Sequence, residues 1–165
     1  MKGRTNMRHL ALVLALAGLV LSGCGKSAEE RRLESELWTK VKALHDTTMA
    51  HVMEFGDLEQ KIDDAVTRHE ELAKRYGRKL KGHSTDDLVT ARAALESLRT
   101  KMENWMKGFK PYDESLSHRE AMASLETSLK WLTEMQEQLE RGIKQADDAL
   151  EAHEQAALSI MKKGG

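Results

Sequence analysis

Residues 122–160, MASLETSLKWLTEMQEQLERGIKQADDALEAHEQAALSI, carry the longest apolar pattern in the chain. The pattern advances by four and three residues through Met122, Leu125, Leu129, Leu132, Gln136, Leu139, Ile143, Ala146, Leu150, His153, Ala157 and Ile160. A 3.5-residue period kept over so many steps predicts one long α-helix whose seam packs against other helices. At about 1.5 Å per residue, this last helix would be about 65 to 70 Å long.

Two further seams precede it. The first contains Leu37, Val41, Leu44, Thr48, His51, Phe55, Leu58, Ile62, Ala65, His69, Leu72, Tyr76 and Leu80. It runs through Gly56 without losing phase, which predicts one helix, kinked or weakened at that glycine. The alternative is a break, with Asp57 and Gln60 forming a capping box after a glycine stop.

The middle seam contains Leu88, Ala91, Leu95, Leu98, Met102, Trp105 and Phe109. Ser84 or Thr85 can cap this helix, and Gly108 and Pro111 end it. At about 36 Å it is too short to cover the last helix. The only proline is Pro111, aromatic residues make up 4%, and no alternating β-branched run occurs. We therefore expect an all-α fold over residues 33–162: an elongated antiparallel bundle of three long helices, or four with a break at Gly56.

The N-terminal segment predicts export. Residues 1–23 combine a basic head with a short apolar run, the layout of a secretory signal peptide, and the absence of an amphipathic period argues against a buried cytosolic helix. Leu21-Ser22-Gly23-Cys24 resembles the bacterial lipobox, which implies cleavage before Cys24 and its acylation, as in palmitate-bearing lipoproteins. Residues 24–32 would then be the lipidated cysteine and its tether. Gly25, in place of the aspartate of inner-membrane retention, favours the outer membrane of a Gram-negative envelope.

The charge balance excludes a nucleic-acid partner. The leader holds three of the 26 basic residues and none of the 27 acidic ones, so the remaining chain has a net charge of −4. It has no basic block. Attachment to the membrane would depend on the lipid alone, and an apolar seam projecting beyond the middle helix would favour a homo-oligomer.

A face of histidine and methionine is the candidate metal site. His45 and Met49 lie four residues apart, as do Met102 and Met106. Imidazole and thioether are donors suited to Cu(I), so these four residues could converge on copper or cap a haem. Core packing is the favoured interpretation, because methionine fills irregular gaps in helical bundles. A partner-docking groove is the third alternative.

Four polar residues interrupt the apolar seams: His51, His69, Gln136 and His153. Such residues commonly fix the register or oligomeric state of packed helices. The functional alternative is a pH-sensitive or metal-bridged pair across two helices. No catalytic motif accompanies them, so we expect no enzyme and no resident cofactor.

Residues 43–49 (ALHDTTM) and 102–109 (MENWMKGF) resemble a family of small lipoproteins from Bacteroidota-type bacteria, often labelled "viral A-type inclusion protein". Members share a lipobox, a helix with His-Asp-x-x-Met, a shorter helix ending in Trp-Met-x-x-Phe and a long charged terminal helix. The resemblance spans residues 24–153. Members often have a proline after the position of Met49 and a methionine at another offset from Met53, so no role for Met53 is carried over.

The resemblance implies an address and an architecture and no activity. The expected function is therefore that of a lipid-anchored, non-enzymatic bundle of the cell envelope with a structural or protein-interaction role. The alternative is a periplasmic copper- or haem-binding protein that uses the histidine–methionine face.

Overall fold

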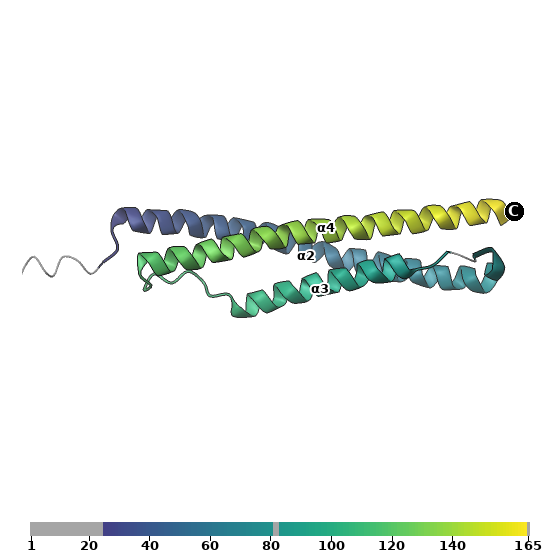
Figure 1. Cartoon of the computed structure of the whole chain (residues 1–165), viewed down its shortest axis with the longest axis horizontal. Helices are drawn as coiled ribbons and strands as arrows, with labels where there is room; N and C mark the ends of the chain where they lie inside the picture. The colour runs from purple at the N-terminus through teal and green to yellow at the C-terminus, as the bar shows by residue number, and fades with distance from the viewer. Residues whose placement is uncertain (1–24, 81–82, 165) are drawn as a thin grey trace, which may run out of the picture.

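The computed structural model of the chain describes residues 25–80 and 83–164. Helix α2 spans Ala28–Tyr76, a short 3₁₀ helix η1 spans Gly77–Leu80, α3 spans Asp86–Gly108 and α4 spans His118–Gly164 (Figure 1). No strand occurs in this part of the chain. The predicted all-α bundle of three long helices is confirmed.

The three helices run up, down and up, so α2 and α4 are parallel to each other and α3 is antiparallel to both (Figure 1). The lengths are 49 residues for α2, 47 for α4 and 23 for α3. The short α3 lies against the middle of the α2–α4 pair, as the length of its seam predicts. No helix in the described part of the chain has the length and apolarity that a membrane span requires.

Helix α2 begins earlier than the bundle boundary at residue 33 that the sequence predicts. The Ser27 hydroxyl accepts a hydrogen bond from the Glu30 N–H at 3.1 Å, and the Glu30 carboxylate accepts one from the Ser27 N–H at 2.7 Å. This capping box starts the helix at Ala28, so only residues 25–27 separate Cys24 from the bundle.

The helix then continues through Gly56 without a break, and no second helix starts at Asp57. Its end is at Gly77, whose φ of 33° is a conformation that glycine adopts without steric cost.

The pairing of α2 with α4 keeps one register over most of its length. Near the start, Glu34 contacts His118, and near the end His69 contacts His153; both pairs are 84 residues apart in the chain. The two contacts are therefore separated by the same 35 residues on each helix, which is five heptads. At the same offset the intervening positions are all buried: Val41, Thr48, Phe55 and Ile62 on α2, and Leu125, Leu132, Leu139 and Ala146 on α4.

Helix α3 closes the core from the third side. Its Leu88, Leu95 and Met102 are at most 1% exposed. Opposite them, Gly142 of α4 allows a close approach, because a Cβ built there would lie 2.7 Å from Cδ1 of Leu98. The packed middle of the bundle therefore depends on a small residue at one position of α4.

Candidate functional site

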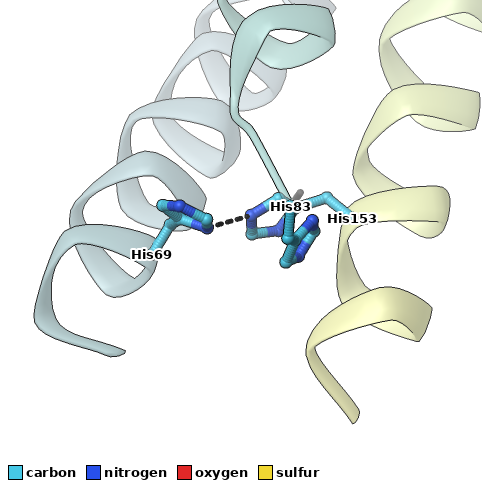
Figure 2. Close-up of side chains that lie close together, drawn as sticks. All are labelled: His69, His83 and His153. Atoms are coloured by element: carbon cyan, nitrogen blue, oxygen red, sulfur yellow. Dashed lines mark hydrogen bonds between the residues drawn. The ribbon is translucent and has the colours of Figure 1, made fainter. Parts of the chain in front are cut away.

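Three histidines from three different elements meet at the end of the bundle where α2 passes into α3. His69 lies on α2, His83 follows η1 in the connection to α3, and His153 lies on α4. Figure 2 shows the three rings converging in the space between the two long helices, with His83 reaching in from the connecting segment. The cluster is built only when all three elements are in place.

The rings are in direct contact. Nδ1 of His69 and Nε2 of His153 lie 3.3 Å apart, a hydrogen-bond distance for a pair in which one nitrogen carries the proton. The ring centroid of His83 lies 5.1 Å from the ring centroid of His69 and 4.8 Å from that of His153. One ligand-capable nitrogen from each histidine lies within 4.8 Å of those of the other two.

The surroundings of His83 and His153 favour the neutral form of these two rings. Burial lowers the pKa of His83, and the positive charge that His69 can carry lowers it further. Burial also lowers the pKa of His153, with smaller contributions from His83, His69 and the guanidinium of Arg68. Nε2 of His83 is buried and has no hydrogen-bond partner among the described residues. A buried polar atom left in this way is uncommon in folded proteins.

Sequence reasoning singled out His69 and His153, together with His51 and Gln136, as polar residues on apolar seams, and its functional alternative was a bridged pair across helices without saying which residues form it. The structure brings His69 and His153 together. It adds His83, which the sequence reasoning missed because this residue belongs to no seam. The only signal was a histidine between two helices, next to the predicted cap at Ser84 and Thr85.

The predicted histidine–methionine face is partly assembled. Nε2 of His45 lies 3.2 Å from Sδ of Met106, and Nδ1 of His45 lies 3.2 Å from Asp46 Oδ1. Met102 is 1% exposed in the hydrophobic core, and Met49 packs against that core. The structure therefore shows two of the four predicted donors in contact, and the other two take part in core packing.

Aromatic residues line the same part of the bundle. Trp105 stacks on Trp131 at 4.6 Å between centroids with an interplanar angle of 5°, and on Phe109 at 4.6 Å. The His45 ring lies 6.4 Å from Trp105. Stacked aromatic pairs add stability beyond their buried area, so this cluster fastens the end of α3 to both long helices.

A buried carboxylate, also missed by sequence reasoning, organises the opposite end of the bundle. Glu34 is fully buried and accepts hydrogen bonds from Lys26 at 2.7 Å, from His118 at 2.8 Å and from the Tyr112 hydroxyl. Burial by itself raises the pKa of Glu34, but the bonds from Lys26, Tyr112 and His118 outweigh it and bring the pKa to about 2. The network joins the N-terminal tether, α2, the loop after α3 and the start of α4.

The other two polar seam residues take different positions. His51 lies between α2 and α4, with its ring nitrogens 3.7 Å from Glu54 and 3.9 Å from Glu140. Gln136 donates to Glu140 of its own helix at 2.9 Å. Cys24, the predicted lipidation site, lies outside the described residues.

Comparison with known proteins gave no match to any family model, any curated protein or any solved structure. The resemblance to the small lipoproteins therefore stays a prediction, and the function has to be argued from the residues of this chain.

Proposed function

We propose that this protein is a lipid-anchored helical bundle of the cell envelope, attached to the outer membrane, with a structural or protein-interaction role. The sequence basis is the signal-like segment 1–23 followed by the lipobox-like Leu21–Cys24 motif. The single structural observation that supports the proposal most is the short distance along the chain from Cys24 to the fold.

Only three residues lie between Cys24 and α2, and one of them is held by the fold. Lys26 is 13% exposed and pairs with the buried Glu34 at 2.7 Å. An acyl group on Cys24 would therefore be coupled closely to the end of the bundle. Because α2 alone is about 70 Å long, the opposite end could lie far from the lipid surface.

The anchor is tested by expressing the full chain in a bacterial host beside a Cys24→Ser variant. We expect the wild type to carry the mass of the acyl chains and to partition with membranes, and the variant to lose both properties. Several acyl chains anchor a protein durably, whereas one holds it only marginally. Equal partitioning of the two proteins would contradict the proposal.

The role is tested by photo-crosslinking in the same cells. Met53 and Leu158 are apolar side chains that are 78% and 48% exposed, so each offers an accessible position for a crosslinking residue, one on α2 and the other on α4. If the protein has an interaction role, a crosslinking residue at either position is expected to give one defined crosslinked product with a partner protein. The same residue at the exposed polar Lys101 is the control. Absence of a defined product at both apolar positions would argue against the interaction role, and the structural role would be the remaining one.

A further inference from the structure

We infer that His69, His83 and His153 form a binding site for a divalent transition-metal ion of the zinc class, with a fourth coordination position left for solvent or a small anion. This site is separate from the predicted histidine–methionine face. It also goes beyond the proposed envelope role, since it depends neither on the lipid nor on a partner.

The geometry supports a metal more than a chance meeting of side chains. Zinc–nitrogen bonds of 2.0–2.1 Å in a tetrahedron place neighbouring ligand atoms about 3.3 Å apart. Nδ1 of His69 and Nε2 of His153 are already separated by 3.3 Å. With all three ligand atoms within 4.8 Å of one another, a movement of about 1.5 Å would complete a three-histidine set.

The chemistry of the three side chains points to the same class of ion. Neutral imidazole suits zinc, copper, nickel and iron, whereas magnesium and calcium prefer oxygen ligands. Among the described residues, the group of possible ligands at this place consists of three imidazoles and includes no carboxylate. Nε2 of His83 is buried and has no hydrogen-bond partner among the described residues, so this nitrogen is free to bind an ion.

The charge around the site bears on the fourth ligand. Three neutral histidines leave both positive charges of the ion uncompensated, and Arg68 lies near enough to lower the pKa of His153. An anionic fourth ligand or a metal-bound hydroxide would relieve this excess charge. The groove beside His153, which α2 and α4 line with residues such as Arg68, Glu71 and Glu154, has a volume of about 1000 Å³ and gives a ligand of this kind access from solvent.

The test is a titration of the full chain with Zn²⁺, and separately with Co²⁺ as a spectroscopic probe, in detergent after removal of metal with a chelator. The chain carries Cys24→Ser so that its thiol cannot bind the ion. We expect one ion per chain, a tetrahedral Co²⁺ spectrum, and a weakening of at least about tenfold for each of His69→Ala, His83→Ala and His153→Ala.

His51→Ala is the matched control, because His51 is a partly buried histidine on the same seam of α2 but outside the cluster. It should bind Zn²⁺ as the unchanged protein does. His45→Ala controls for the histidine–methionine pair in the same way. His83 lies outside the helices, so His83→Ala should keep the helical fold by circular dichroism even if the two helix variants do not.

A second readout is the melting temperature, which bound Zn²⁺ should raise in the unchanged protein and in His51→Ala but not in His83→Ala. The inference is overturned by the absence of stoichiometric binding, or by binding that survives His83→Ala unchanged. Either result would leave the cluster as three packed rings at the end of the bundle, with a hydrogen bond between His69 and His153.

Discussion

Two glycines in the long helices illustrate how much a single residue depends on what lies opposite to it. Gly142 on α4 is buried, and an added Cβ would come within 2.7 Å of the Leu98 side chain. Gly56 on α2 is exposed, and an added Cβ would meet nothing within 4 Å. Both lie inside helices, where alanine is intrinsically favoured by about 1 kcal/mol.

Gly142→Ala should therefore stabilise the fold less than Gly56→Ala does, by about 0.5–2 kcal/mol of unfolding free energy, because the Leu98 side chain has to move to admit the new methyl group. Gly56→Ala should raise the free energy of unfolding by about 0.5–1 kcal/mol. Urea unfolding followed by circular dichroism measures both. If Gly142→Ala stabilised the protein as much as Gly56→Ala, the close packing of α3 on α4 at Gly142 would be refuted.

The buried carboxylate of Glu34 is the second residue-scale test. Glu34→Ala leaves Lys26, Tyr112 and His118 without their common acceptor, and should cost about 1–3 kcal/mol of unfolding free energy. Glu36 is two residues away on the same helix, half exposed, and pairs only with Arg32 on the surface. Glu36→Ala should cost less than about 0.5 kcal/mol, so similar losses for the two variants would contradict the network.

At the scale of the elements, the parallel pairing of α2 and α4 depends on heptad spacing in both helices. The pairs Glu34–His118 and His69–His153 bracket five heptads with no insertion on either side. A slip by one residue would move the buried set of one helix away from that of the other. Polar residues at the two ends of an apolar seam hold this register, because an unpaired buried polar group is costly.

The register predicts which cysteines can be joined. In a Cys24→Ser background, Thr48→Cys with Leu132→Cys keeps the 84-residue offset and should form a disulfide on mild oxidation, stabilising the bundle by about 2–4 kcal/mol. Thr48→Cys with Thr133→Cys, shifted by one residue to an exposed position, is the control. Thiol counting by mass spectrometry decides the matter, and efficient bridging of only the shifted pair would disprove the register.

The extent of the helices could be predicted closely from sequence, because a 3.5-residue apolar period is visible in the residues of a single helix and needs no knowledge of the helices that pack against it. The seams predict α3 and α4 almost to their ends, and the phase through Gly56 predicts a single α2. The start of α2 at Ala28 lies before the boundary at residue 33 that the apolar pattern predicts. Glu34 and the capping pair Ser27–Glu30 are polar, and the apolar pattern contains no information about polar residues that are buried or bonded at a helix start.

At the scale of the whole molecule, the two ends are held by different chemistry. Among the described residues, all the carboxylates whose pKa is clearly lowered lie at one end, on the first turns of α2 and α4 and in the loop between α3 and α4. They are Glu29, Glu30, Glu34, Asp113 and Glu120. The other end carries the histidine cluster. Acid should therefore destabilise first the end of the bundle that contains the start of α2.

For Glu34 the sign follows from its folded-state pKa of about 2, which lies below the ordinary value of 4.5. Between these values the folded protein binds fewer protons at Glu34 than the unfolded protein does. The contribution of Glu34 to the free energy of unfolding is therefore fully present above about pH 4.5 and is lost as the pH drops toward 2. The difference in melting temperature between the wild type and Glu34→Gln should shrink from pH 5 to pH 2.5. The effect of the non-ionisable surface change Met53→Gln should stay constant, and a constant difference for Glu34→Gln would contradict the assigned pKa.

The sequence alone determined the helical class, the three seams, the length mismatch of the middle helix and the lipobox-like motif, because each of these is a property of residues close together in the chain. Only the tertiary structure decided that His83 joins His69 and His153, that His45 reaches Met106, and that Glu34 is buried among Lys26, Tyr112 and His118. The contacts within these groups join residues up to 84 positions apart in the chain, and they depend on the register between helices. A periodic pattern tells which face of a helix is buried, but the partner of each polar residue on that face is set by how the helices align.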